Sequence, residues 1–244
     1  MARLDAESET KPRGLELAKN PTLKQTNVKY TRKTISVTNV RGSEDIFKLD
    51  RQGFQLGQLQ SKLSYEDFAS TDSIVNQYYE EVKAFLKQNT GAVEVLPFDF
   101  QANQTAKAAA RRLCHFHRSF ADQYAGRRYQ IVKLFALTSP KDMTSLTKSP
   151  SVWKPLRGPA YDSPLAVCDY RTVKHDDRVP CDIIFPDYLG ETYNFWPNPD
   201  HRFYYIDGQE ANETWMIKCF DSATAENPEI TQCATPIPIP FALR

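Results

Sequence analysis

The sequence has few of the residues that cross-link small folds, and it has no long apolar runs. Its 244 residues include only five cysteines, which are scattered and form no CxxC pair. This pattern favours reduced thiols over a disulfide framework or a zinc site. The N-terminus carries no apolar stretch typical of a secretory signal, and no segment reaches the length of a membrane span. We therefore expect a cytoplasmic protein without a membrane span.

An excess of charge of one sign is also missing. The chain has 31 basic and 30 acidic residues, a formal net charge of +1. A nucleic-acid-binding domain would need a basic excess gathered on one face, so we expect no nucleic-acid partner. Aromatic residues, by contrast, are plentiful at 12%. They suit a β-rich core or an apolar pocket for a small molecule.

The order of the patterned segments predicts a mainly β fold with flanking helices. Residues 1–27 are polar and interrupted by Pro12, Gly14 and Pro21, which favours a flexible N-terminal arm. Residues 28–244 form a single expected domain, with a Ser/Thr/Pro/Lys-rich inserted loop at 136–151. Helices are predicted at 72–88 and 104–124. Strands are predicted at 30–40, 93–98, 129–135, 165–169, 182–185, 191–195, 202–206 and 214–220. Helices first and short strands afterwards indicate a β-sandwich or jelly roll.

Eight short strings, in collinear order over about three quarters of the chain, resemble one family. The strings are 40–45 (VRGSED), 49–54 (LDRQGF), 78–82 (YYEEV), 128–132 (RYQIV), 152–159 (VWKPLRGP), 162–169 (DSPLAVCD), 201–205 (HRFYY) and 218–222 (KCFDS). Together they are similar to the fungal hydroxylase/desaturase family related to gibberellin desaturase and the cephalosporin 7α-methoxylation protein.

This resemblance implies a double-stranded β-helix core, of the jelly-roll or cupin-like type. It also implies Fe(II) and 2-oxoglutarate as cofactors, and a tailoring role in fungal secondary metabolism with a small-molecule substrate. The implied mechanism is oxidative, with the metal carrying the chemistry and the protein positioning the substrate.

The metal-binding motif that the resemblance implies has no counterpart here. Family members carry His-x-Asp between the strand and the helix matched by 95–99 and 105–113, whereas residues 97–105 read PFDFQANQT. The family's second histidine follows the Asp-Ser matched by Asp221 and Ser222, but no histidine occurs after His201. A facial site for non-haem iron needs two histidines and one carboxylate. We therefore assign no metal ligand, and the cofactor stays unknown.

Seven residues are candidates for the functional site. The predicted catalytic residues are His201, Tyr204 and Asp221, and the predicted substrate-binding residues are Trp153, Arg157, Tyr129 and Lys218. Histidine is the side chain suited to acid–base chemistry near neutral pH, so His201 is a candidate for it, but His201 also suits a structural hydrogen bond at the start of a strand. Arg157 suits a forked contact with a substrate carboxylate, or a brace between the turn at 158–159 and Asp162 or Asp169.

Two groups of histidines are candidate metal sites. His175 and Asp177 spell His-x-Asp and, with His201, offer a facial triad, although residues 174–178 equally suit a charged surface turn. His115 and His117 point apart on a helix and to the same side only on a strand.

Three functions remain open from the sequence. The first is a tailoring enzyme of the iron-dependent hydroxylase/desaturase type. The second is a metal-free enzyme on the same scaffold that catalyses a redox-neutral cyclisation, dehydration or isomerisation. The third is an inactive or binding-only relative. The substrate and the oligomeric state are not indicated.

Overall fold

The computed structural model describes residues 2–4, 12–15, 26–30, 33–95, 130–137, 151–161, 164–184, 189–221 and 235–238. These residues form a mainly β protein with a few helices, as predicted. The strands are β1 (Ala2–Leu4), β2 (Arg13–Leu15), β3 (Val28–Tyr30), β4 (Val37–Asn39), β5 (Phe54–Gln58), β6 (Gln130–Leu137), β7 (Ser151–Pro155), β8 (Leu165–Cys168), β9 (Arg178–Ile184), β10 (Leu189–Phe195), β11 (Phe203–Tyr205), β12 (Glu213–Asp221) and β13 (Thr235–Pro238).

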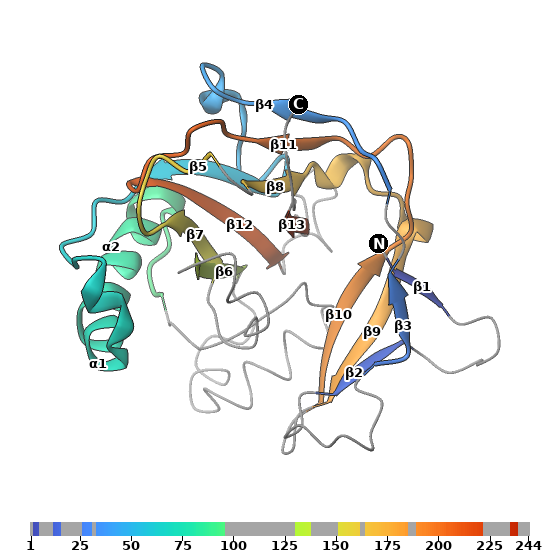
Figure 1. Cartoon of the computed structure of the whole chain (residues 1–244), viewed down its shortest axis with the longest axis horizontal. Coiled ribbons are helices and arrows are strands. Elements are labelled where there is room, and N and C mark those ends of the chain that lie inside the picture. The colour runs from blue at the N-terminus through green and yellow to red at the C-terminus, as the bar shows by residue number, and fades with distance from the viewer. Residues whose placement is uncertain are drawn as a thin grey trace.

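Two four-stranded sheets enclose the main core (Figure 1). One sheet has the order β5-β12-β6-β7, and the other has the order β13-β8-β11-β4. The residues buried between them come from both sheets: Val40, Phe47, Phe54, Trp153, Leu165, Val167, Ile206, Trp215 and Ile217. Trp215 and Ile217 alternate along β12, as expected where every second side chain points to the same face. The two sheets therefore share one apolar interior.

A helix covers the outer face of the β12 sheet. It starts as α1 (Thr71–Ser73), passes through a π-helical segment (Ile74–Tyr78) and continues as α2 (Tyr79–Thr90). Val82, Phe85 and Leu86 pack there against Val152 and Met216. Gly57 is needed at this interface, because a Cβ atom there would lie 2.7 Å from the Phe85 ring. The predicted helix at 72–88 is confirmed, and Gly91 ends it in the left-handed conformation.

The N-terminal strands leave the predicted pattern. Residues 30–40 were expected to form one strand, but they belong to two, β3 and β4. β3 pairs with β1, whereas β4 pairs in parallel with β11. The irregular residues 33–36 lead into β4, so the chain has passed from one sheet to another. β1 and β2 lie within the segment expected to be an arm, and β2 pairs with β9 beside the β9–β10 hairpin.

Several expectations fall on residues that are not described. The predicted helix at 104–124, half of the predicted strand at 93–98 and most of the inserted loop at 136–151 lie outside the described residues. Within the described ranges, no helix combines the length and apolar character needed to cross a bilayer.

Candidate functional site

One end of the sandwich is closed by the turn at residues 50–53. The amide of Lys218 on β12 donates to the Gly53 carbonyl at 2.8 Å, and the amide of Tyr170, after β8, donates to the Gln52 carbonyl at 3.1 Å. The Asp169 amide donates to the Arg202 carbonyl at 2.9 Å, which continues the pairing of β8 with β11. Residues distant in the sequence therefore meet at this end of both sheets.

A buried lysine between two carboxylates is the main polar feature there. Lys218 Nζ donates to Asp221 Oδ2 at 2.8 Å and also to Asp50 Oδ1. The side chains of Lys218 and Asp221 are 0% exposed, whereas that of Asp50 is 51% exposed. We call these three residues the Lys218 cluster. It joins a fully buried ion pair to a carboxylate in contact with solvent.

A β-bulge explains how Lys218 reaches Asp221. Residues three apart on a regular strand point to opposite faces of the sheet. The register of β12 with β6 shifts between Lys218 and Phe220, so the strand contains an irregularity between the two charged residues. Bulges reorient side chains in this way and are common beside functional sites. The sequence pattern predicted the strand but gave no sign of the bulge.

Tyr204 lies at the edge of the inter-sheet core near the same end. Its ring packs edge-on against Phe47, with centroids 4.8 Å apart, and is tilted against Phe54 at 5.9 Å. It is partly buried and belongs to the border of the core. Tyr204 can therefore contribute an apolar wall with a polar tip to a ligand site.

His201 is placed in a separate, closed cluster. His201 Nε2 lies 3.0 Å from Asp177 Oδ2, and the His201 side chain is only 2% exposed. The Asn198 side-chain amide and the Lys174 backbone amide also donate to the Asp177 carboxylate. We call His201, Asp177 and Asn198 the His201 cluster. It fastens the turn at 198–201 to the 3-10 turn His175–Asp177.

The hydrogen bonds determine the protonation of Asp177. Burial by itself would raise the pKa of this carboxyl group, but donors from Asn198, Lys174 and His201 outweigh burial. The pKa of Asp177 is therefore lowered, and the carboxylate stays ionised near neutral pH. Its oxygens already accept several hydrogen bonds, which is the arrangement of a structural anchor.

The described residues do not fit the iron site that the resemblance implies. No group of three or more His, Cys, Asp or Glu side chains suited to a metal ion occurs among them. His175 is 89% exposed and lies beside Asp176, while His201 is enclosed with Asp177. The candidate facial triad of His175, Asp177 and His201 therefore does not come together as a metal site. His115 and His117 lie outside the described residues.

The predicted substrate-binding residues are dispersed. Trp153 is 4% exposed in the inter-sheet core and pairs across strands with Trp215. Arg157 lies on the surface, 3.8 Å over the Tyr65 ring and 3.2 Å from Glu66, while Asp169 is paired with Arg171 and Asp162 lies outside the described residues. Tyr129 lies outside the described residues. Among the described members of this group, Lys218 alone joins the predicted catalytic Asp221.

The sequence assigned no site role to three charged residues at this end. Asp50 reaches Lys218 across 168 positions, and no local pattern signals such a pairing. Asp169 and Arg171 form a forked ion pair with a closest contact of 2.6 Å, and Asp169 is buried. A buried aspartate directly after an apolar strand, with an arginine two positions later, was a signal available in the sequence.

Known relatives of this chain are fungal oxidative enzymes. The hydroxylase/desaturase efuI of Hormonema carpetanum is 26% identical over 86% of this chain and 78% of its own length. The hydroxylase/desaturase CTB9 of Cercospora beticola is 27% identical over 80% of this chain and 67% of its own length.

A solved structure extends this similarity to the fold. The iron and alpha-ketoglutarate-dependent endoperoxidase NvfI superposes with a TM-score of 0.74 at 20% identity, over 96% of this chain and 88% of that protein. The resemblance to the fungal hydroxylase/desaturase family is thus confirmed. Because the model of the oxidoreductase/YMDC permease-like domain matches residues 3–236, the chain belongs to that family.

Proposed function

We propose that this chain is a tailoring enzyme of fungal secondary metabolism, of the hydroxylase/desaturase type, that acts on a small molecule. Its core would be a double-stranded β-helix. The substrate would bind at the end of the sandwich where the turn at 50–53 lies. The names of the relatives support the reaction class, and the two facing four-stranded sheets support the core.

The observation that carries the proposal is the Lys218 cluster. A fully buried lysine and aspartate are costly to hold in an apolar interior, because both charges lose their hydration. Here the pair lies where both sheets end, and Asp50 links it to solvent. Ionisable groups arranged in this way are typical of functional sites more than of cores.

Each member of the cluster has a proposed role. Asp221 accepts a proton from the substrate or returns one to it, as a general base or acid. The Lys218 ammonium keeps Asp221 oriented. It donates one of its protons to Asp50, which exchanges it with water, and the neutral amine then takes up the proton held by Asp221. Tyr204, which is partly buried at the border of the core, provides an apolar contact for the substrate, and the buried Phe47 and Phe54 support its ring.

No step of this mechanism passes through iron, because the described residues do not build the site for it. The proposed oxidative reaction would need ligands from residues that are not described, and His115 and His117 are the remaining histidines of the chain. His201 is proposed as a structural residue, consistent with its enclosed contact to Asp177.

A metal-free, redox-neutral reaction on the same scaffold is the second candidate. The Lys218 cluster favours it, since proton transfer by Asp221 and Lys218 suffices for a cyclisation, dehydration or isomerisation. A binding-only relative is the third candidate, and it would hold the ligand at the same place without turnover.

One experiment separates the three. The protein is incubated with metabolite extract of a fungal producer, once with Fe(II), 2-oxoglutarate and ascorbate, and once with a chelator, and products are followed by mass spectrometry. Gain of an oxygen atom or loss of two hydrogen atoms only with iron supports the hydroxylase/desaturase function. Isomerised or dehydrated products in both samples support the metal-free enzyme. Retention of a metabolite on the protein without any product would contradict both enzymatic functions.

The proposal extends to the organisation of the chain. We propose residues 1–27 as an N-terminal arm and 28–244 as a single catalytic domain with a loop inserted at 136–151. Among the described cysteines, Cys168 is a free and buried thiol, which supports the proposed cytoplasmic location.

A further inference from the structure

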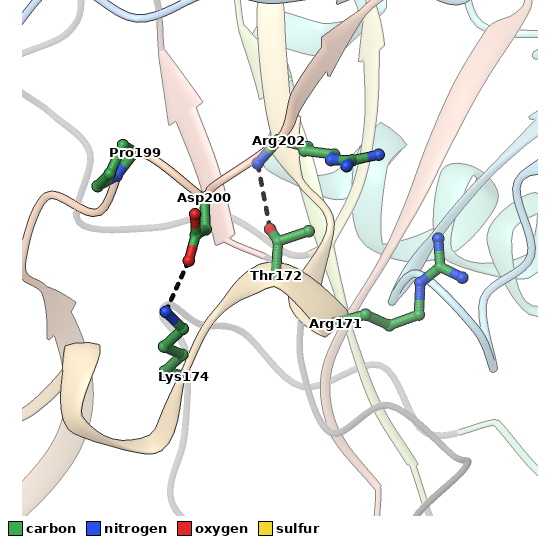
Figure 2. A pocket seen from close by; sticks show the side chains of 6 residues that line it. All are labelled: Arg171, Thr172, Lys174, Pro199, Asp200 and Arg202. Carbon is green, nitrogen blue, oxygen red and sulfur yellow. Dashed lines mark hydrogen bonds and ion pairs between the residues drawn. The ribbon is translucent and has the colours of Figure 1, made fainter.

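A polar hollow lies next to the end of the sandwich that carries the Lys218 cluster. Its volume is about 420 Å³, within the range of small-molecule sites. The lining residues are Arg171, Thr172, Lys174, Pro199, Asp200 and Arg202 (Figure 2). We call it the Arg202 hollow. It is connected to the Lys218 cluster through the backbone, because Tyr170 is bonded to Gln52 and Lys218 to Gly53.

Three basic side chains line the hollow, and one of them has no acidic partner among the described residues. Lys174 Nζ is paired with Asp200 at 2.6 Å, and Arg171 with the buried Asp169 at 2.6 Å. Arg202 is exposed, and its guanidinium group has no hydrogen bond or ion pair with any residue that the structure describes. The hollow thus has the charge to bind one monovalent anion.

The backbone holds Arg202 firmly in place. The Arg202 amide donates to Thr172 Oγ1 at 3.1 Å, and Thr172 Oγ1 donates to the Asp169 carbonyl at 2.7 Å. Figure 2 shows the side chains of Arg202 and Arg171 extending to the same side, away from the Lys174–Asp200 pair. Two guanidinium groups on one side of a hollow favour an oxyanion, whose geometry matches their N–H donors.

One aromatic residue closely follows the lining residue Arg202 along the chain. Arg202 precedes Tyr204 by two positions, so the two side chains share one face of the extended chain. The Tyr204 ring is partly buried and packs against Phe47 and Phe54 of the core. A molecule whose anionic group is bound at Arg202 would therefore have the ring of Tyr204 as its apolar neighbour.

We propose that the Arg202 hollow binds the carboxylate of a small monoanionic molecule with an apolar body. The idea that this molecule is the substrate rests on the proposed function, whereas the binding itself does not. A dianion such as 2-oxoglutarate would keep one charge uncompensated in the hollow. The sequence suggested a forked contact between Arg157 and a substrate carboxylate, and we assign this contact to Arg202 instead.

Calorimetric titration of the full chain tests this site without any turnover. The probes are phenylbutyrate, its neutral amide phenylbutyramide, phenyl phosphate and 2-oxoglutarate. We expect phenylbutyrate to bind at least about tenfold more tightly than the amide, since a charge-assisted hydrogen bond is lost in the amide. Arg202→Gln should weaken phenylbutyrate binding by a similar factor. Lys87→Gln, which removes one exposed charge from α2, should leave the binding unchanged.

The outcomes are distinct. Equal affinity for acid and amide, or equal affinity of the wild type and Arg202→Gln, would overturn the proposal. Tighter binding of phenyl phosphate or of 2-oxoglutarate than of phenylbutyrate would replace the monocarboxylate by another anion and overturn it as well. Asp221→Asn should retain phenylbutyrate binding. Loss of turnover in that variant with retained binding therefore separates failure of the proposed function from failure of this site.

Discussion

The Lys218 cluster and the His201 cluster both bury an aspartate beside a basic side chain, but they differ in their connection to solvent. In the His201 cluster, Asp177 accepts hydrogen bonds from Asn198, Lys174 and His201, and the network closes on itself. In the Lys218 cluster, the buried pair continues to Asp50, which is half exposed. A closed network fixes two turns to each other, whereas an open one gives protons a route to solvent.

Loss of the lysine should have the largest effect on stability. Lys218→Met leaves Asp221 fully buried without its cation, and we expect the free energy of unfolding to fall by about 3–5 kcal/mol. Urea denaturation followed by tryptophan fluorescence measures this change. The double variant Lys218→Met/Asp221→Leu should recover much of the loss, since an apolar pair leaves no unpaired charge.

The matched control for this variant is Lys87→Met. Lys87 is exposed on α2, so the same substitution there should change the free energy of unfolding by no more than about 0.5 kcal/mol. An equally small loss for Lys218→Met would show that the buried ion pair is not formed.

The closed cluster should give the next largest effect. Asp177→Ala removes the acceptor for three groups and leaves His201 enclosed without its partner. We expect a loss of about 2–3 kcal/mol, because buried donors would stay unsatisfied. Thermal denaturation with and without the substitution tests it, and an unchanged melting temperature would contradict the assignment as an anchor.

The pH dependence of stability should provide a second test of the role of Asp177. The pKa of Asp177 is lowered in the folded protein, so its contribution is fully present above the unfolded value of about 3.9 and is lost as the pH falls through the folded pKa. The stability difference between the wild type and Asp177→Asn should therefore shrink as the pH is lowered from about 5 to 3. A difference that is constant over this range would mean that the carboxylate is not preferentially stabilised by folding.

Arg157 should have the smallest effect. Its contacts with Tyr65 and Glu66 are on the surface, where both Arg157 and Glu66 are mostly exposed. We expect Arg157→Ala to cost about 0.5 kcal/mol and to leave phenylbutyrate binding unchanged. A binding defect would restore the sequence-based prediction that Arg157 contacts the substrate.

Local patterns predicted much of the fold. The alternating residues of β12, the apolar stripe of the helix at 71–90 and the stop at Gly91 could all be recognised from neighbouring positions. The pairing of β11 with β4, and the division of residues 30–40 between two sheets, could not. They depend on contacts between distant segments, for which the local sequence carries no signal.

The site was predicted in part, for the same reason. Lys218 and Asp221 were both candidates because they fall in a string shared with the family, but they were assigned separate roles. Only the structure reveals the bulge that brings them together. It also reveals the contribution of Asp50, which lies in the turn before β5. His201 was chosen for its chemistry, and burial beside Asp177 now makes it a structural residue in our proposal.

The most direct test compares turnover of the fungal metabolite extract by the wild type, Asp221→Asn and His201→Gln, at equal concentrations of folded protein. The account predicts that Asp221→Asn loses at least about a hundredfold in rate, the scale of a missing acid–base group. It predicts that His201→Gln is less stable but turns over at the wild-type rate per folded molecule. Full activity of Asp221→Asn together with an inactive, folded His201→Gln would contradict it.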